Sequence, residues 1–155
     1  ISACLVGSEM CIRDRQWSVP VLATPIATDA SVVETVGRPA LEGVAAVVPQ
    51  ALVQQAGISN ASVRHFRDDL RRQLRTARLA GSVLVAAQAY DAVMMLASTA
   101  NSVHSTSPTS LRIFLESASY TGLLASYAYA TGSHTGVPGD QLSIVPLGSL
   151  ADGLF

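Results

Sequence analysis

The sequence predicts an α/β fold, because short β-rich runs alternate with helical patterns along the chain. Two apolar runs, at 19–26 and 41–49, enclose a segment whose valines recur at helical spacing. Strand, short helix and strand in this order are typical of a parallel α/β unit. Longer helical patterns occupy residues 59–119, and β-rich runs separated by glycine-rich turns follow them.

The first unit shows the clearest boundaries. Run 19–26 carries its prolines near its ends and is rich in β-formers, so we expect a buried strand there. Thr28 or Asp29 can cap the following helix, and Gly37 can end it. Residues 41–49 are expected to form a second buried strand.

A long amphipathic helix is predicted from Ser59 onward. Its apolar face consists of residues at helical spacing, namely Val63, Phe66, Leu70 and Leu74. Arginines occupy much of the remaining surface, but the net charge of the chain is only -1. This pattern favours a solvated helix face, so no nucleic-acid partner is expected.

Segment 81–103 is apolar on nearly every side, which predicts a buried helix with Met94 and Met95 as core filler. A membrane span is the alternative, but the segment barely reaches the roughly 20 apolar residues that a span needs. Polar residues also interrupt it: Gln88, Asp91, Ser98 and Thr99. No transmembrane segment is therefore expected.

The remaining elements are shorter. Residues 107–119 are expected to form a capped helix with Pro108 in its first turn, where proline is tolerated. The inward face of this helix should comprise Leu111, Phe114 and Leu115. Strands are expected at 123–129 and 142–147, between turns rich in glycine.

The sequence carries no catalytic signature. It has no G-x-S-x-G elbow, no phosphate-binding glycine loop and no carboxylates on one element that are paired for acid–base catalysis. His65, His104 and His134 fall on separate elements without ligand spacing. A triad of Ser133, His134 and Asp140 carries no weight, because such residues can be chosen from almost any chain. We therefore expect no enzyme, no metal and no cofactor.

Residues 1–15 hold both cysteines of the chain, Cys4 and Cys11, with no ligand cluster beside them. Back-translated, residues 5–14 can be written CTC GTG GGC TCG GAG ATG TGT ATA AGA GAC. That sequence resembles an adapter used to prepare sequencing libraries. We expect this leader to be non-native and the natural sequence to begin near Gln16.

Several short motifs follow one another in an order that resembles one known family. "AYDAV" at 89–93, "YTG" at 120–122 and "HTG" at 134–136 lie between β-rich runs at either end. With them, residues 16–155 resemble the C-terminal part of a type I periplasmic binding protein, of the class that serves branched-chain amino acid transporters. We expect a fragment of that two-lobe fold, a parallel sheet with flanking helices, incomplete at its N-terminus.

The resemblance implies a division of the chain between two lobes. Residues 16–49 would be the end of the second lobe, and residues 50–141 the helices and hairpin of the first. Residues 142–155 would be the terminal strand that returns to the second lobe. The hinge crossovers would lie at Pro49 and Leu142.

The family holds its ligand in the cleft between the lobes. The turn after the first strand would therefore supply ligand-binding residues: Thr24, Ile26, Thr28 and Asp29. Amino-acid-binding members carry an acidic residue at a position that aligns near Ile26, where this chain has none. Asp29 would substitute if the alignment shifts, and its alternative role is to cap the next helix.

The function implied is that of a non-enzymatic receptor, periplasmic or lipid-anchored outside the cell, that closes on a small ligand and delivers it to the permease of an ABC importer. The ligand would be an amino acid, an amide or a similar molecule. Two alternatives stay open: a ligand-sensing regulatory domain of the same fold, and a fragment of an α/β enzyme with its nucleophile upstream.

The apolar segment 81–103 also has a consequence for stability. It would be covered by a first-lobe sheet formed by residues upstream. We therefore expect residues 16–155 alone to be marginally stable or prone to aggregation.

Overall fold

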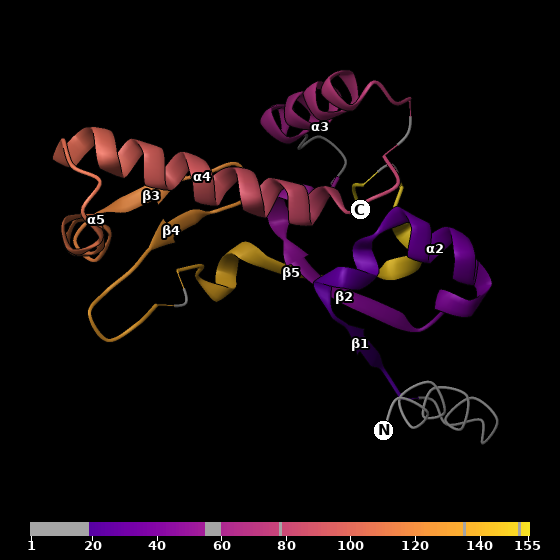
Figure 1. Cartoon of the computed structure of the whole chain (residues 1–155). Helices are drawn as coiled ribbons and strands as arrows, with labels where there is room; N and C mark the ends of the chain where they lie inside the picture. Colours follow the sequence, from indigo (N-terminus) through magenta and orange to yellow (C-terminus); the bar gives the residue numbers. More distant parts are fainter. Residues whose placement is uncertain (1–18, 55–59, 78, 135, 152) are drawn as a thin grey trace, which may run out of the picture.

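The structure, a computed structural model, describes residues 19–54, 60–77, 79–134, 136–151 and 153–155. The expected leader and the natural start near Gln16 lie outside the described residues. Figure 1 shows a small sheet with a short helix beside it, and a long helix that extends away from the sheet toward a hairpin and a further helix. Helices and strands mix along the chain, which confirms the predicted α/β class.

The first α/β unit forms as predicted, with a shorter first strand. Strand β1 (Val21–Ala23) pairs in parallel with β2 (Val44–Pro49), and helix α2 (Ala30–Val36) connects them. β1 ends early because a 3-10 turn (Pro25–Thr28) begins at a proline, which has no N–H to donate to a strand partner. Gly37 ends α2 with a φ of 82°, a region that glycine enters without strain.

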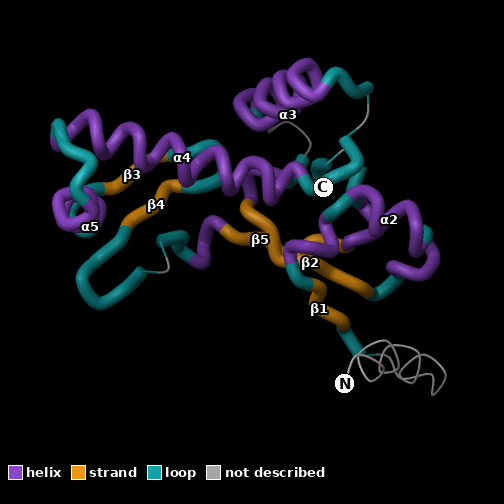
Figure 2. The backbone as a smooth tube through the Cα atoms, viewed as in Figure 1, coloured by secondary structure: helices purple, strands orange, loops and turns teal. Residues whose placement is uncertain are grey.

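Strand β5 (Leu142–Pro146) completes a three-stranded sheet in the order β1-β2-β5, drawn in orange in Figure 2. β5 runs antiparallel to β2, so the expectation of a parallel sheet holds only for β1 and β2. One face of the sheet packs into the core through Ala46 and Val48. The opposite face leaves Leu22 58% and Ile144 67% exposed, so the prediction of a fully buried first strand is wrong.

Helix α3 (Ala61–Leu74) begins at Asn60, whose side chain accepts a hydrogen bond from the Val63 N–H at 3.3 Å. Val63 is buried in the core. The Phe66 ring packs on Tyr90 of the neighbouring long helix, with 5.2 Å between ring centroids. Leu74 is exposed, so the apolar face of this helix ends one turn earlier than predicted.

Ion pairs cover the arginine-rich side of α3. Arg71 Nη1 lies 3.6 Å from Asp68 Oδ1, and Arg72 pairs with Asp69. His65 Nε2 lies 3.4 Å from Asp69 Oδ2, and its side chain is exposed. These pairs match the solvated helix face that the sequence predicts.

Helix α4 (Val83–Val103) begins at the cap Ser82, and its first turns pack into the core. The rest of its surface is more open than predicted. Its large exposed apolar side chains are Val85, Tyr90, Val93, Met94 and Leu96. The expectations of a buried helix and of Met94 as core filler are wrong for the described chain, because a three-stranded sheet is too small to cover 21 helical residues. By length and composition α4 could cross a membrane, a property that core helices share.

Helix α5 (Pro108–Leu115) packs beside α4 with its proline in the first turn, as predicted. It is shorter than predicted, because Ser119 already belongs to the next strand, and the Ser107 side chain makes no capping hydrogen bond. Strands β3 (Ser119–Thr121) and β4 (Ser126–Ala128) then form an antiparallel hairpin. The strand predicted at 123–129 is confirmed only as β4, because residues 122–125 form the hairpin turn.

One hydrophobic cluster joins the sheet, the helices and the C-terminal segment. Its members include Val33, Val48, Leu52, Val63, Leu84, Leu124, Leu147 and Leu154. The C-terminal segment is also held by its backbone, since the Phe155 N–H donates to the Leu52 carbonyl at 2.9 Å. The long helix and the hairpin are thereby anchored to the sheet at one end.

Candidate functional site

The segment expected to bind ligand lies at the C-terminal end of β1. Thr24 is exposed there, whereas Thr28 is only 2% exposed. The Thr28 hydroxyl donates to the Pro25 carbonyl at 2.6 Å and lies 2.7 Å from the Ser82 hydroxyl. Its hydrogen-bonding capacity is therefore largely used inside the protein, where it ties the strand end to the start of α4.

Asp29 is the N-cap of α2. Its Oδ1 accepts hydrogen bonds from the Ser31 N–H at 2.8 Å and from the Ser31 hydroxyl at 2.6 Å. The capping role is therefore present in the structure, and one carboxylate oxygen is engaged by it. The side chain of Ile26 lies outside the described part of the chain.

The two residues expected to act as hinges are neighbours. Pro49, the last residue of β2, is the register partner of Leu142, the first residue of β5. The side-chain amide of Gln50 donates to the Asp140 carbonyl at 2.8 Å, which joins the two segments just outside the sheet. The chain therefore leaves the sheet and returns to it at one place.

A pocket of about 450 Å³ opens beside this place. We call it the junction pocket, because the strand ends, the middle of α4 and the hairpin all contribute to its wall. Lining residues from these elements include Ala23, Pro25, Pro49, Gln88, Tyr127 and Leu142. Both expected hinge residues thus border one concave site, whereas the expected ligand residues Thr24, Thr28 and Asp29 do not line it.

Asp91 of α4 forms the part of this wall that faces the hairpin, and its side chain is 2% exposed. Its carboxylate accepts hydrogen bonds from the N–H groups of Leu123 at 2.6 Å and Leu124 at 2.9 Å. It also accepts one from the Tyr127 hydroxyl at 2.8 Å. These donors offset the removal of a buried carboxylate from water.

Asp91 also raises the pKa of Tyr127 and limits the space for a side chain at position 122. Burial raises the pKa of the Tyr127 hydroxyl above its ordinary value of 10.0, and the hydrogen bond to Asp91 and the charge of Asp91 raise this pKa further. The hydroxyl therefore remains a donor at neutral pH. A Cβ atom at position 122 would lie 2.6 Å from Asp91 Oδ2 and 2.8 Å from the Tyr127 ring, so only glycine fits this turn.

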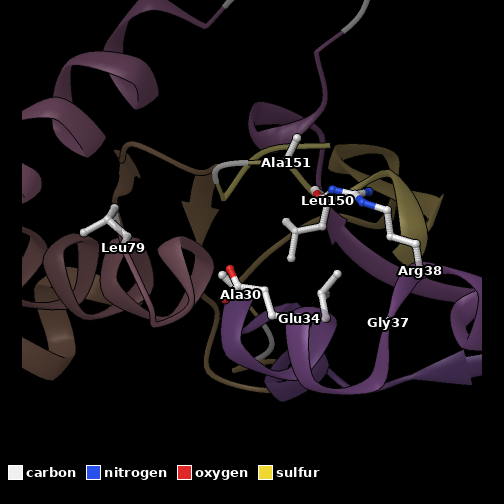
Figure 3. Close-up of a pocket in the computed structure, with 8 residues that line it drawn as sticks. Ala30, Glu34, Gly37, Arg38, Leu79, Leu150 and Ala151 are labelled. Atoms are coloured by element: carbon white, nitrogen blue, oxygen red, sulfur yellow. Dashed lines mark hydrogen bonds between the residues drawn. The ribbon is translucent and has the colours of Figure 1, made fainter. Parts of the chain in front are cut away.

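A second pocket, of about 430 Å³, lies between α2 and the C-terminal segment. Figure 3 shows Arg38 extending across it toward Leu150. The Arg38 guanidinium donates to the Leu150 carbonyl at 2.9 Å and to the Gly148 carbonyl. We interpret this arginine as a tether for the C-terminal segment, since backbone carbonyls use its donors.

Histidines do not assemble a metal or catalytic centre in the described part of the chain, where no group of metal-ligating side chains occurs. His134 Nε2 lies 3.6 Å from Glu116 Oε1 at the surface. His104 is the C-cap of α4 and has a φ of 48°.

The sequence did not predict the contact between Asp91 and the hairpin. Asp91 lies in the "AYDAV" motif, and the hairpin turn begins in the "YTG" motif. A lone carboxylate in an otherwise apolar helix is the signal that could have predicted it, because such a group needs several donors when buried. The "YTG" motif supplies the glycine that makes room for it.

No family model matches the chain, and no curated protein and no solved structure matches it either. The junction pocket and the motifs in the sequence are therefore the grounds on which a function can be argued.

Proposed function

We propose that this chain is part of an extracytoplasmic solute receptor with the two-lobe fold of type I periplasmic binding proteins. The sheet with α2 would belong to one lobe, and α4, α5 and the hairpin to the other. The receptor would be periplasmic or lipid-anchored outside the cell, and would deliver its solute to the permease of an ABC importer.

The junction pocket carries this proposal. A hinge-bending receptor needs a concave site at the place where its lobes are joined. In this chain Pro49 and Leu142 are register partners, both border the pocket, and the segments on either side of them lead to different halves of the structure. A solute held there would contact both halves at once.

Such a solute would act by shifting a population between open and closed forms. It would bind the closed form more tightly, because closure brings more of both halves into contact with it, and the difference in affinity sets the shift. An enzyme is a weaker interpretation, because the acidic side chain at the first strand end, Asp29, is engaged as the cap of α2.

A distance measurement between the two halves tests this proposal. Spin labels would be placed on exposed positions of α2 and α4 by Thr35→Cys and Asn101→Cys, with Cys4→Ser and Cys11→Ser to remove other thiols. L-leucine, L-phenylalanine and benzamide would be added in turn. We expect at least one of these solutes to move the distance distribution to shorter values in a saturable way.

The control pair lies within one half of the molecule. Asn101→Cys combined with Ser119→Cys labels α4 and β3, and its distances should not change when solute is added. The proposal fails if no solute alters the first pair, or if both pairs change equally.

A further inference from the structure

We infer that the solute of the junction pocket is a small uncharged molecule with an apolar body, a conclusion that rests on the proposed receptor function. Among the described residues that line the pocket, all are apolar except Gln88, Asp91, Tyr127 and Tyr129. A lining of this kind favours an apolar occupant through the hydrophobic effect.

Charge is the second argument. Asp91 is the one charged side chain among the described lining residues, and three protein donors already bind its carboxylate. A carboxylate has about four acceptor sites, so at most one remains, on a side chain that is 2% exposed. A ligand ammonium would find little of this carboxylate to contact.

A ligand carboxylate would also lack a partner in the pocket. No described arginine or histidine lines the pocket, and Asp91 would repel an anion. A free amino acid would therefore place two charges in a site that pairs neither of them well, and an unpaired charge is strongly disfavoured away from water.

Neutral hydrogen bonds are available instead. The Gln88 amide can both donate and accept, and the Tyr129 hydroxyl can do the same. The Tyr127 hydroxyl donates to Asp91 and keeps its lone pairs for a ligand donor. These groups fit an amide or alcohol attached to the apolar body. A cavity of about 150 Å³ can hold benzene, so the pocket has room for one ring with such a substituent.

Three probes built on the same benzene ring distinguish a neutral ligand from an anionic and a cationic one. Benzamide is neutral, benzoate is anionic and benzylamine is cationic at pH 7, and their binding to the whole chain can be compared by titration calorimetry. We expect saturable one-to-one binding of benzamide, and dissociation constants about tenfold or more higher for both charged probes. Benzoate or benzylamine binding as tightly as benzamide would overturn the inference.

Two substitutions on the same helix assign the binding to the junction pocket. Ala92 is exposed and lines the pocket, so Ala92→Phe fills it without disturbing the core. Ala97 is also exposed on α4 but does not line the pocket, so Ala97→Phe is the matched control. We expect A92F to weaken benzamide binding about tenfold or more, and A97F to leave it unchanged. Equal effects would place the binding elsewhere and contradict the inference.

Failure of this inference differs from failure of the receptor proposal. If a charged probe binds best and A92F still removes that binding, the solute class is wrong but the pocket remains a binding site. If no probe binds, the apolar site is refuted, while the spin-label distances with L-leucine and L-phenylalanine still decide whether the halves close on a solute.

Discussion

Replacing Asp91 with asparagine should loosen the hairpin from α4. The substitution keeps the size of the side chain but exchanges one acceptor oxygen for an NH₂ group. The N–H groups of Leu123 and Leu124 and the hydroxyl of Tyr127 all point at this side chain, at 2.6–2.9 Å. Asparagine can accept from one of the two backbone groups, so the other loses its partner.

The magnitude follows from the bonds that are lost. A hydrogen bond to a charged group contributes about 1.5–3 kcal/mol, and a buried donor left without a partner costs about 1–3 kcal/mol. The Tyr127 hydroxyl can rotate to accept from the new NH₂ group, which offsets part of the loss. We therefore expect D91N to lower the free energy of unfolding by about 2–4 kcal/mol.

Urea unfolding followed by circular dichroism measures the global effect. If the parent chain unfolds cooperatively, a denaturant slope of about 2 kcal/mol per molar lowers the midpoint by about 1–2 M, and for a marginally stable parent D91N should be unfolded without urea. Hydrogen exchange at residues 122–125 gives a local measurement that does not require cooperative unfolding, and protection there should be lost. Asp140→Asn is the matched control, because Asp140 is exposed. Unchanged midpoint and unchanged exchange in D91N would refute the assignment of Asp91 as the anchor of the hairpin.

Three other changes test separate parts of the structure. Gly153 has a φ of 81°, and a Cβ there would overlap the buried Val83 side chain, so Gly153→Ala should lower the free energy of unfolding by about 1–3 kcal/mol in urea titrations. Gly132→Ala, where a Cβ meets nothing within 4 Å, should change it by less than about 0.5 kcal/mol. Asp29→Ala should lower it by about 1 kcal/mol through loss of the α2 cap, and Asp29→Ser should restore most of that; equal losses in both variants would argue against capping. The pKa of Tyr127 is raised in the folded state. The contribution of this tyrosine to the free energy of unfolding is therefore fully present below pH 10 and is lost as the pH rises further. Tyr127→Phe should therefore make alkaline unfolding curves less steep in pH, and identical slopes would show that this hydroxyl is not coupled to folding.

The elements that the sequence predicts well are those whose ends are marked by local chemistry. Asp29 and Gly37 bound α2 as expected, because a side-chain cap and a residue with positive φ act within a few residues. The helix predicted at 81–103 begins at a similar local signal, which the structure supplies: the Ser82 hydroxyl accepts a hydrogen bond from the Val85 N–H at 3.3 Å. Such signals do not depend on the rest of the fold.

The features that sequence reasoning missed depend on contacts between distant segments. The direction of β5 relative to β2 is set by the path of the chain from Pro49 to Leu142, which no local pattern records. The exposure of Met94 depends on how much sheet lies against α4, and that also is not a local property. The expected ligand residues Thr28 and Asp29 were identified by position in a strand-end turn, and the structure adds that both are hydrogen-bonded within the protein.

Asp91 links the stability of the hairpin to the shape of the junction pocket. Gln88, Ala92 and Met95 lie on the same helix within about one turn of Asp91 and line the pocket from that side. Tyr127 lines it from the hairpin, and its hydroxyl is held by the Asp91 carboxylate. A hairpin freed from Asp91 would carry the tyrosine away from the helix and widen the space between them. The D91N variant should therefore bind benzamide more weakly even under conditions where it remains folded, because a looser wall makes fewer contacts with a bound ring.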